Sequence, residues 1–199
     1  MKLKIIKKMN ERFYLLKIEL LDIEPAIWRR FVVPASITLD RLHDVIQIVM
    51  GWTDSHLHEF TIGKKRYTEF PESKEDGLTC GRYRLGDLIK QNGRGFHYLY
   101  DFGDYWEHEL VIEHNRYFDP ELREEIVCLD GSRSCPPEDV GGVPGYYKFC
   151  SAMQNINHEE HNDYMQWFGK DFNREYFDCD TVNLELLKYL RWSRTRYKN

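Results

Sequence analysis

The sequence predicts an α+β fold: a single domain with an antiparallel or mixed sheet of five or six strands and helices packed around it. Three patterns support this prediction. Apolar residues alternate after Phe13, an aromatic hairpin pattern surrounds Gly103, and apolar residues follow helical spacing after Thr38 and after Pro144. The length of 199 residues fits one domain, which can bury roughly 70% of its unfolded surface.

The first two strands are predicted at 13–21 and 26–33. Alternation in the first segment is typical of a strand with one buried face, carried by Tyr14, Leu16, Ile18 and Leu20. The residues from Asp22 to Pro25 turn the chain, and Pro34 ends the second strand because proline cannot donate to the ladder. In the second strand, Trp28 and Arg30 share one face.

A helix is predicted at 38–50, with Thr38 as its N-cap and Gly51 just beyond its end. A strand is predicted at 57–62. His56 and His58 share one of its faces if the strand already begins at His56. Two imidazoles in this arrangement could bind a metal ion, and a pair of histidines without a metal is the alternative.

Residues 63–84 are charged and rich in turn formers, so the sequence predicts a short strand at Arg66–Tyr67 followed by a mobile loop. A short helix is expected at 85–89, before the central hairpin.

The central hairpin pairs 96–101 with 105–112 across a three-residue loop, Phe102-Gly103-Asp104. In this register one face carries the aromatic and aliphatic side chains together with His108. A slip by one residue would mix apolar and polar faces, so burial favours the first register. His108 then lies in the core, where it either finds a hydrogen-bond partner or serves as a ligand.

The second distinctive stretch runs from Asp130 to Tyr146. Pro136 and Pro137 followed by two acids fit the first turn of a helix. Cys135 would then be the N-cap, where the helix end favours a thiolate. Gly141-Gly142 would stop this helix, and we expect 136–142 to lie against the turn at 101–104. An extended piece at 125–129 precedes this stretch, and helices are predicted after it at 144–155, 159–168 and 181–192.

The net charge of −5 is unevenly distributed. Eight of the 28 basic residues lie in 1–8 and 191–199, which leaves 20 basic against 33 acidic residues, a net charge of −13, for 9–190. Such an acidic body is a poor nucleic-acid groove unless the basic ends converge. No segment approaches the ~20 apolar residues of a membrane span, and no apolar signal region follows the first lysines. Five cysteines without a Cys-x-x-Cys pair predict free thiols and a cytoplasmic location.

Several motifs occur in an order that is similar to a known family. They are Tyr14-Leu15-Leu16-Lys17-Ile18, Pro25-Ala26-Ile27-Trp28-Arg29-Arg30, Leu42-His43, Met50-Gly51-Trp52, His56-Leu57-His58-Glu59-Phe60, the stretch from Tyr100 to His108, Cys135-Pro136-Pro137-Glu138-Asp139-Val140-Gly141-Gly142 and Trp167-Phe168-Gly169. Over about 11–185 the chain resembles the Ri-plasmid (pRiA-type) open-reading-frame-three-like family, also labelled the transposon passenger TnpR-like family. The resemblance implies an association with mobile genetic elements and brings no established activity. The chain shows no serine-recombinase catalytic motif.

Two classes of function follow from these patterns, and the sequence favours the first. The first is a non-enzymatic binding module for a protein partner, since aromatic excess, rigid loops and clustered charge suit an interface. Its candidate binding residues are Trp28, Arg30, Tyr100, Trp106, Cys135 and Pro137. The second is a metal-dependent hydrolase, with a divalent metal as its cofactor. Its candidate catalytic residues are Asp101, Asp104, His108, Glu138 and Asp139, and its candidate metal ligands are His56, His58 and His108.

A nucleic-acid-binding role for the basic ends is a further alternative. The last residues alternate arginines with Trp192 and Tyr197, which could stack on bases and neutralise phosphates.

Overall fold

The computed structural model describes the backbone of residues 12–73 and 75–196, and the side chains as far as residue 191. Most of the basic residues at the two ends lie outside this range, so the nucleic-acid prediction for those ends is not addressed by the structure. None of the described helices combines the length and the apolar character needed to cross a bilayer.

One sheet of eight strands forms the centre of the molecule, in the order β5-β4-β3-β6-β7-β1-β2-β8. The strands are β1 (Phe13–Leu20), β2 (Ile27–Pro34), β3 (His58–Ile62), β4 (Lys65–Thr68), β5 (Leu78–Thr79), β6 (Gly95–Tyr100), β7 (Trp106–Tyr117) and β8 (Val127–Ser132). All neighbours are antiparallel except β4 and β5, which are parallel. The sheet is therefore mixed, as predicted.

The predicted number of five or six strands is wrong. Within 63–84 the short strand predicted at Arg66–Tyr67 is present as β4, but the loop predicted after it contains the two residues of β5, which pair with β4. The piece predicted as extended at 125–129 continues to Ser132 and joins the sheet by pairing with β2. Short edge strands of this kind depend on their neighbours, and they leave little period-two signal of their own.

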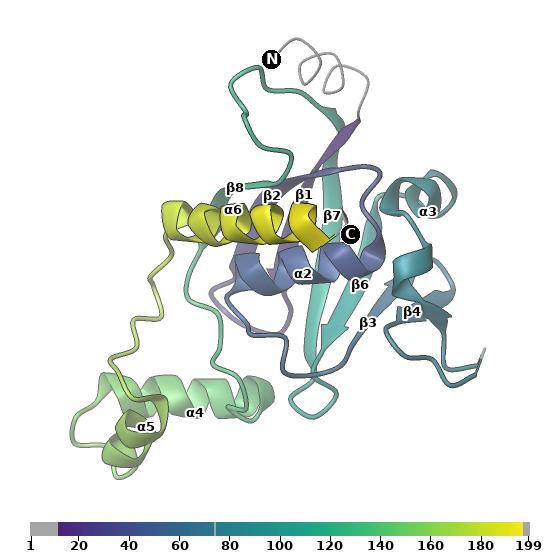
Figure 1. The fold of residues 1–199 in the computed structure, drawn as a ribbon. Coiled ribbons are helices and arrows are strands. Elements are labelled where there is room, and N and C mark those ends of the chain that lie inside the picture. The colour runs from purple at the N-terminus through teal and green to yellow at the C-terminus, as the bar shows by residue number, and fades with distance from the viewer. Residues whose placement is uncertain (1–11, 74, 197–199) are drawn as a thin grey trace.

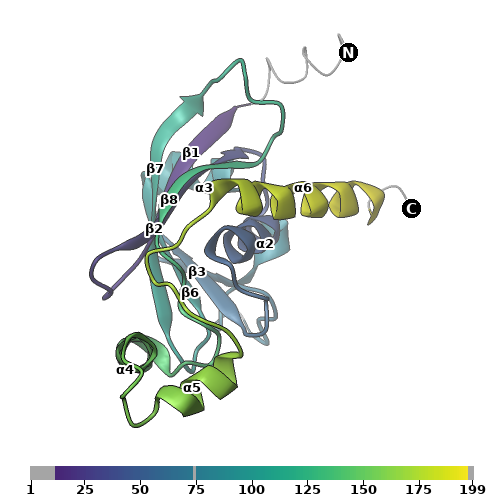
Figure 2. The ribbon, with the colours of Figure 1, turned by 90° about the vertical axis from the view of Figure 1, so that its left-hand side faces the viewer.

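Two long helices cover one face of the sheet. They are α2 (Leu39–Met50) and α6 (Cys179–Arg196), which pack against each other. Figures 1 and 2 show both on the same side of the strands, with α4 (Gly142–Gln154) and α5 (His161–Phe168) at one end of the sheet. The remaining helices, η1 (Cys80–Arg82) and α3 (Leu85–Asn92), follow β5.

The helices α2, α4, α5 and α6 occur close to their predicted positions, but the start of α4 differs from the prediction. The Gly141-Gly142 pair was expected to stop a preceding helix, but α4 begins at Gly142. Gly141 and Gly142 have φ values of +93° and +65°, which let the chain turn sharply into α4.

The predicted register of the central hairpin is confirmed. β6 pairs with β7 so that Phe96 lies opposite Leu110, Tyr98 opposite His108, and Tyr100 opposite Trp106. The aromatic face, including His108, is fully buried, whereas Glu107 is exposed. Alternation with period two fixed this register because any slip would have exposed the apolar face.

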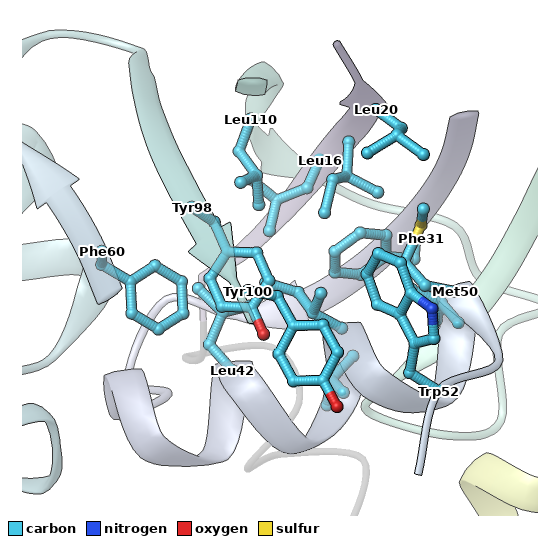
Figure 3. Packing of buried hydrophobic residues seen from close by; sticks show 14 of the residues in the cluster. Leu16, Leu20, Phe31, Leu42, Met50, Trp52, Phe60, Tyr98, Tyr100 and Leu110 are labelled. Atoms are coloured by element: carbon cyan, nitrogen blue, oxygen red, sulfur yellow. The ribbon is translucent and has the colours of Figure 1, made fainter. Parts of the chain in front are cut away.

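The core lies between this face of the sheet and α2. Figure 3 shows Tyr98 and Tyr100 of β6 pointing into it, with Phe60 of β3 on one side and Trp52 on the other. Tyrosines in a core need partners for their hydroxyl groups. Those partners connect the core to the candidate site.

Candidate functional site

The turn between β6 and β7 is held in a single conformation by its own hydrogen bonds. Asp101 Oδ1 accepts from Gly103 N at 2.8 Å, and Asp101 O accepts from Tyr105 N at 2.7 Å. Asp101 N in turn donates to Leu57 O at 3.0 Å, which ties the turn to the segment before β3. Asp101 and Tyr105 adopt positive φ values of 57° and 60°. Few residues other than glycine adopt this conformation, so the surrounding contacts must stabilise it.

The loop before α4 takes its path from hydrogen bonds to distant elements. Trp52 Nε1 donates to Pro136 O at 3.0 Å. The Glu138 carboxylate accepts from Thr53 N at 2.9 Å and from the Tyr100 hydroxyl at 3.1 Å. The Tyr100 hydroxyl also accepts from Ser55 N at 3.0 Å, so a core tyrosine links two loops.

These contacts correct the prediction of a helical turn beginning at Pro136. Pro136 and Pro137 lie outside any regular element, and Glu138 and Asp139 form a turn, so Cys135 is no helix N-cap. The expected stabilisation of a thiolate is absent as well, since burial raises the pKa of Cys135. Partners elsewhere in the chain, rather than local helix signals, set the backbone here.

The two loops are locked together, which confirms the expectation that 136–142 lies against the turn at 101–104. Gly141 N donates to Asp104 Oδ2 at 3.0 Å. A Cβ atom placed on Gly142 would lie only 2.5 Å from Asp104 O, so only glycine allows this approach. Figure 1 shows the β6–β7 turn beside the start of α4.

Between the two loops, three carboxylate side chains converge around one imidazole nitrogen. His56 Nε2 lies 3.2 Å from Asp139 Oδ1, 3.6 Å from Asp101 Oδ2 and 3.9 Å from Glu138 Oε2. The side chain of Asp101 is only 8% exposed, and that of Glu138 is 20% exposed. We call this group, His56, Asp101, Glu138 and Asp139, the acidic recess.

The other two predicted metal ligands lie in the core and do not join the acidic recess. The His58 ring stacks on His43 at 3.5 Å, and Nε2 lies 3.8 Å from the Cys80 sulfur. Burial and the neighbouring His43 lower the pKa of His58 to about 3. His108 is fully buried with Nδ1 3.2 Å from Tyr98 O, and burial lowers its pKa to about 3. His56 and His58 do not share a face because β3 begins only at His58.

The predicted binding residues are divided among three places. Arg30 donates to the Glu113 carboxylate through two nitrogens, at 2.6 and 3.0 Å, and its guanidinium lies over the Trp28 ring. Arg30 and Trp28 are both on the half-buried face of β2. Trp106 is fully buried, with its indole nitrogen lacking a hydrogen-bond partner among the described residues. Tyr100 donates to Glu138 of the acidic recess, and Cys135 and Pro137 precede Glu138 in the same loop.

The sequence did not identify the network that supports the acidic recess from α2. His43 connects Tyr98 and Asp54, with Nδ1 2.7 Å from the Tyr98 hydroxyl and Nε2 2.7 Å from Asp54 Oδ1. The hydrogen bond with His43 lowers the pKa of Asp54. Gln47 Oε1 accepts from Asp54 N at 2.9 Å, which fixes the segment that leads to His56. His43 appeared in the sequence only within the Leu42-His43 motif, which gives no link to Asp54 or Tyr98.

Comparison with known proteins places the chain in a family. It is 43% identical over 156 residues to the "Uncharacterized protein y4hQ" of Sinorhizobium fredii (strain NBRC 101917 / NGR234), covering 77% of this chain and 79% of that protein. The crystal structure of the "Protein of Unknown Function MM3350" from Methanosarcina mazei Go1 is similar as well. Its TM-score is 0.77 at 35% identity, covering 85% of this chain and 97% of that one.

The family model described as "Plasmid pRiA4b ORF-3-like protein" matches residues 12–181, which include every strand, every residue of the acidic recess and the start of α6. The chain therefore belongs to the plasmid pRiA4b ORF-3-like protein family.

Proposed function

We propose that the protein is a binding module that holds a cationic group in the acidic recess. The observation that carries this proposal is the convergence of three carboxylates on His56 Nε2. Throughout the described part of the chain, the ion pairs of these carboxylates are all with His56. Carboxylates this close repel one another, so a cation supplied from outside stabilises the arrangement.

The surface around the acidic recess supports binding to a partner. Three large side chains near the acidic recess are about half exposed: Leu57 (51%), Phe102 (50%) and Tyr105 (55%). Leu57 follows His56 in the chain, and the other two lie in the turn after Asp101. Large exposed side chains of this kind can anchor an interface that also contains polar groups. The rigid loops also favour binding, because little conformational entropy is lost when they are already ordered.

The alternative of a metal-dependent hydrolase has less support from the same geometry. Such an enzyme needs a base beside the reacting group. Glu138 and Asp139, the predicted bases, do lie in the acidic recess. Two other predicted catalytic residues do not serve there, because His108 is fully buried and Asp104 uses its carboxylate to accept from Gly141 N. The four side chains of the acidic recess can all bind a cation through an oxygen or nitrogen lone pair.

A comparative capture experiment tests the proposal. The wild-type protein and the variants Asp101→Asn and Asp139→Asn are immobilised and exposed to lysate, and retained proteins are identified by mass spectrometry. Glu109→Gln, which changes an exposed carboxylate on β7, is the matched control. We expect at least one partner that is retained by the wild type and the control and is lost with both recess variants. Asp139 is exposed, so its variant keeps the test valid if Asp101→Asn folds poorly.

The proposal is contradicted if all four proteins retain the same partners in the same amounts. A partner that needs only the basic C-terminal end, and whose binding falls steeply with salt, would favour the nucleic-acid alternative.

A further inference from the structure

We infer that the cation held in the acidic recess is a divalent metal ion, bound directly by His56 Nε2, Asp101 and Asp139. This inference rests on the proposed function, because it names the cation that the recess holds. Glu138 stands beside these three ligands and adds a further negative charge.

The distances in the acidic recess fit a single ion. The ligand atoms of His56, Asp101 and Asp139 all lie within 4.8 Å of one another. With metal–ligand bonds of about 2.1 Å, the separations of 3.2 and 3.6 Å from Nε2 correspond to ligand–metal–ligand angles of about 100° and about 120°. Such angles lie in the range of tetrahedral and distorted octahedral sites. One ion can therefore contact all three side chains with little movement.

The state of the imidazole supports the same conclusion. His56 Nε2 is buried and makes no hydrogen bond, although Asp139 Oδ1 is only 3.2 Å away. The 3.2 Å contact is thus an ion-pair distance and not a hydrogen bond. A buried nitrogen that makes no hydrogen bond is uncommon, and ligation of a metal ion would use its lone pair.

The charge of the site also favours a divalent counter-ion, because one imidazole faces three carboxylates. Asp101 is a nearly buried carboxylate whose Oδ1 accepts from Gly103 N, while Oδ2 faces His56 at 3.6 Å. Burying a carboxylate beside two others is costly unless a positive charge compensates it. A divalent ion would reduce the formal charge of the three carboxylates from −3 to −1.

The donor set indicates which metals fit. One imidazole nitrogen and two carboxylates suit Mn²⁺, Fe²⁺, Co²⁺ or Zn²⁺ better than Mg²⁺ or Ca²⁺, which prefer oxygen ligands alone. The site is also prepared for an ion, because Thr53 N and the Tyr100 hydroxyl hold Glu138 and Gly103 N holds Asp101. Such supporting hydrogen bonds orient ligands before a metal arrives.

Calorimetric titration with Mn²⁺ alone, after treatment with a chelator, tests the inference. Mn²⁺ is preferred to Zn²⁺ because the chain has five free cysteines, which would bind zinc elsewhere. We expect about one Mn²⁺ ion per chain, and weaker binding of Mg²⁺. His56→Gln and Asp139→Asn should each lower the affinity for Mn²⁺ by at least about tenfold, since even supporting residues contribute this much.

The matched controls are His97→Gln and Glu109→Gln, which change a histidine and a glutamate that face each other on exposed positions of β6 and β7. Both should bind Mn²⁺ as the wild type does. The inference is overturned if Mn²⁺ does not bind stoichiometrically, or if the recess variants and the controls bind it equally well.

Repeating the partner capture with a chelator separates this inference from the proposed function. Loss of the recess-dependent partner in the chelator supports a metal as the cation. A partner that still binds in the chelator, and still depends on Asp139, would show that the partner supplies the cation. In that case the inference fails while the proposed function stands.

Discussion

Replacing Gly142 by alanine tests the contact that shapes the acidic recess. Gly142 has a φ of +65°, and a Cβ atom there would lie 2.5 Å from Asp104 O. A residue other than glycine in this conformation costs about 1–2 kcal/mol. Relief of the clash would also move Asp104 away from Gly141 N, weakening a hydrogen bond to a charged group that is worth about 1.5–3 kcal/mol when fully formed. Because Asp104 is partly exposed, we take the lower end and expect a total loss of about 3 kcal/mol.

Gly169→Ala is the matched control for this prediction. Gly169 has a φ of +76°, but nothing lies within 4 Å of the new Cβ atom, so only the conformational cost of about 1–2 kcal/mol remains. Urea denaturation, monitored by tryptophan fluorescence, measures the free energy of unfolding of each variant. Gly142→Ala should also weaken the binding of Mn²⁺, whereas Gly169→Ala should not. Equal losses of stability in the two variants would refute the close packing of the loops.

Three further predictions concern the support of the acidic recess and the core. Burial lowers the pKa of His108 to about 3, so below its ordinary value of 6.5 the unfolded chain takes up a proton that the folded protein does not. The free energy of unfolding should therefore decrease as the pH is lowered from 7 to 5. His108→Gln should make this decrease smaller by about 2 kcal/mol. Tyr100→Phe removes the hydroxyl that joins Ser55 N to Glu138, so we expect a loss of about 1–2 kcal/mol in urea denaturation and weaker Mn²⁺ binding. Arg29→Met should cost at least about 3 kcal/mol, measured by thermal unfolding, because the buried guanidinium donates to several carbonyl groups that would lose their partner.

Each of these predictions has a control on an exposed side chain. His97→Gln should leave the pH dependence of stability unchanged, and Tyr176→Phe should leave Mn²⁺ binding unchanged. Arg66→Met should leave thermal stability nearly unchanged, since Arg66 is exposed. If a control changes the measured property as much as the corresponding variant of the buried residue does, the role given to that buried residue is contradicted.

The central hairpin could be predicted from the sequence because local and global signals agree there. Alternating aromatic residues from Phe96 to Ile112 allow only one register that buries a continuous face, and the structure has that register. The helices were also predictable to within a few residues, because caps and apolar spacing are local properties.

The position of the loop before α4 against the turn at 101–104 was predicted, but its backbone conformation could not be, because that conformation depends on partners far away in the chain. Two prolines and two acids favour a helical turn locally, but Trp52, Thr53 and Tyr100 bind the loop through Pro136 and Glu138. Tertiary hydrogen bonds of this kind override local propensity and leave no pattern within the loop itself.

The candidate site was predicted in part for the same reason. Asp101, Glu138 and Asp139 were identified because two acidic loops were expected to meet, and they do lie around one centre. His56 was identified with the wrong companions, since periodicity grouped it with His58. The strand that would place both histidines on one face begins two residues too late.

A crystal structure of the protein grown with Mn²⁺ would test the central claim most directly, through the anomalous scattering of manganese. We predict one strong anomalous peak within about 2.3 Å of His56 Nε2, Asp101 Oδ2 and Asp139 Oδ1. The peak should be absent from crystals of Asp139→Asn grown in the same way. A manganese peak elsewhere on the chain, with His56 Nε2 bound to a protein side chain instead, would contradict the claim that the acidic recess is a metal site.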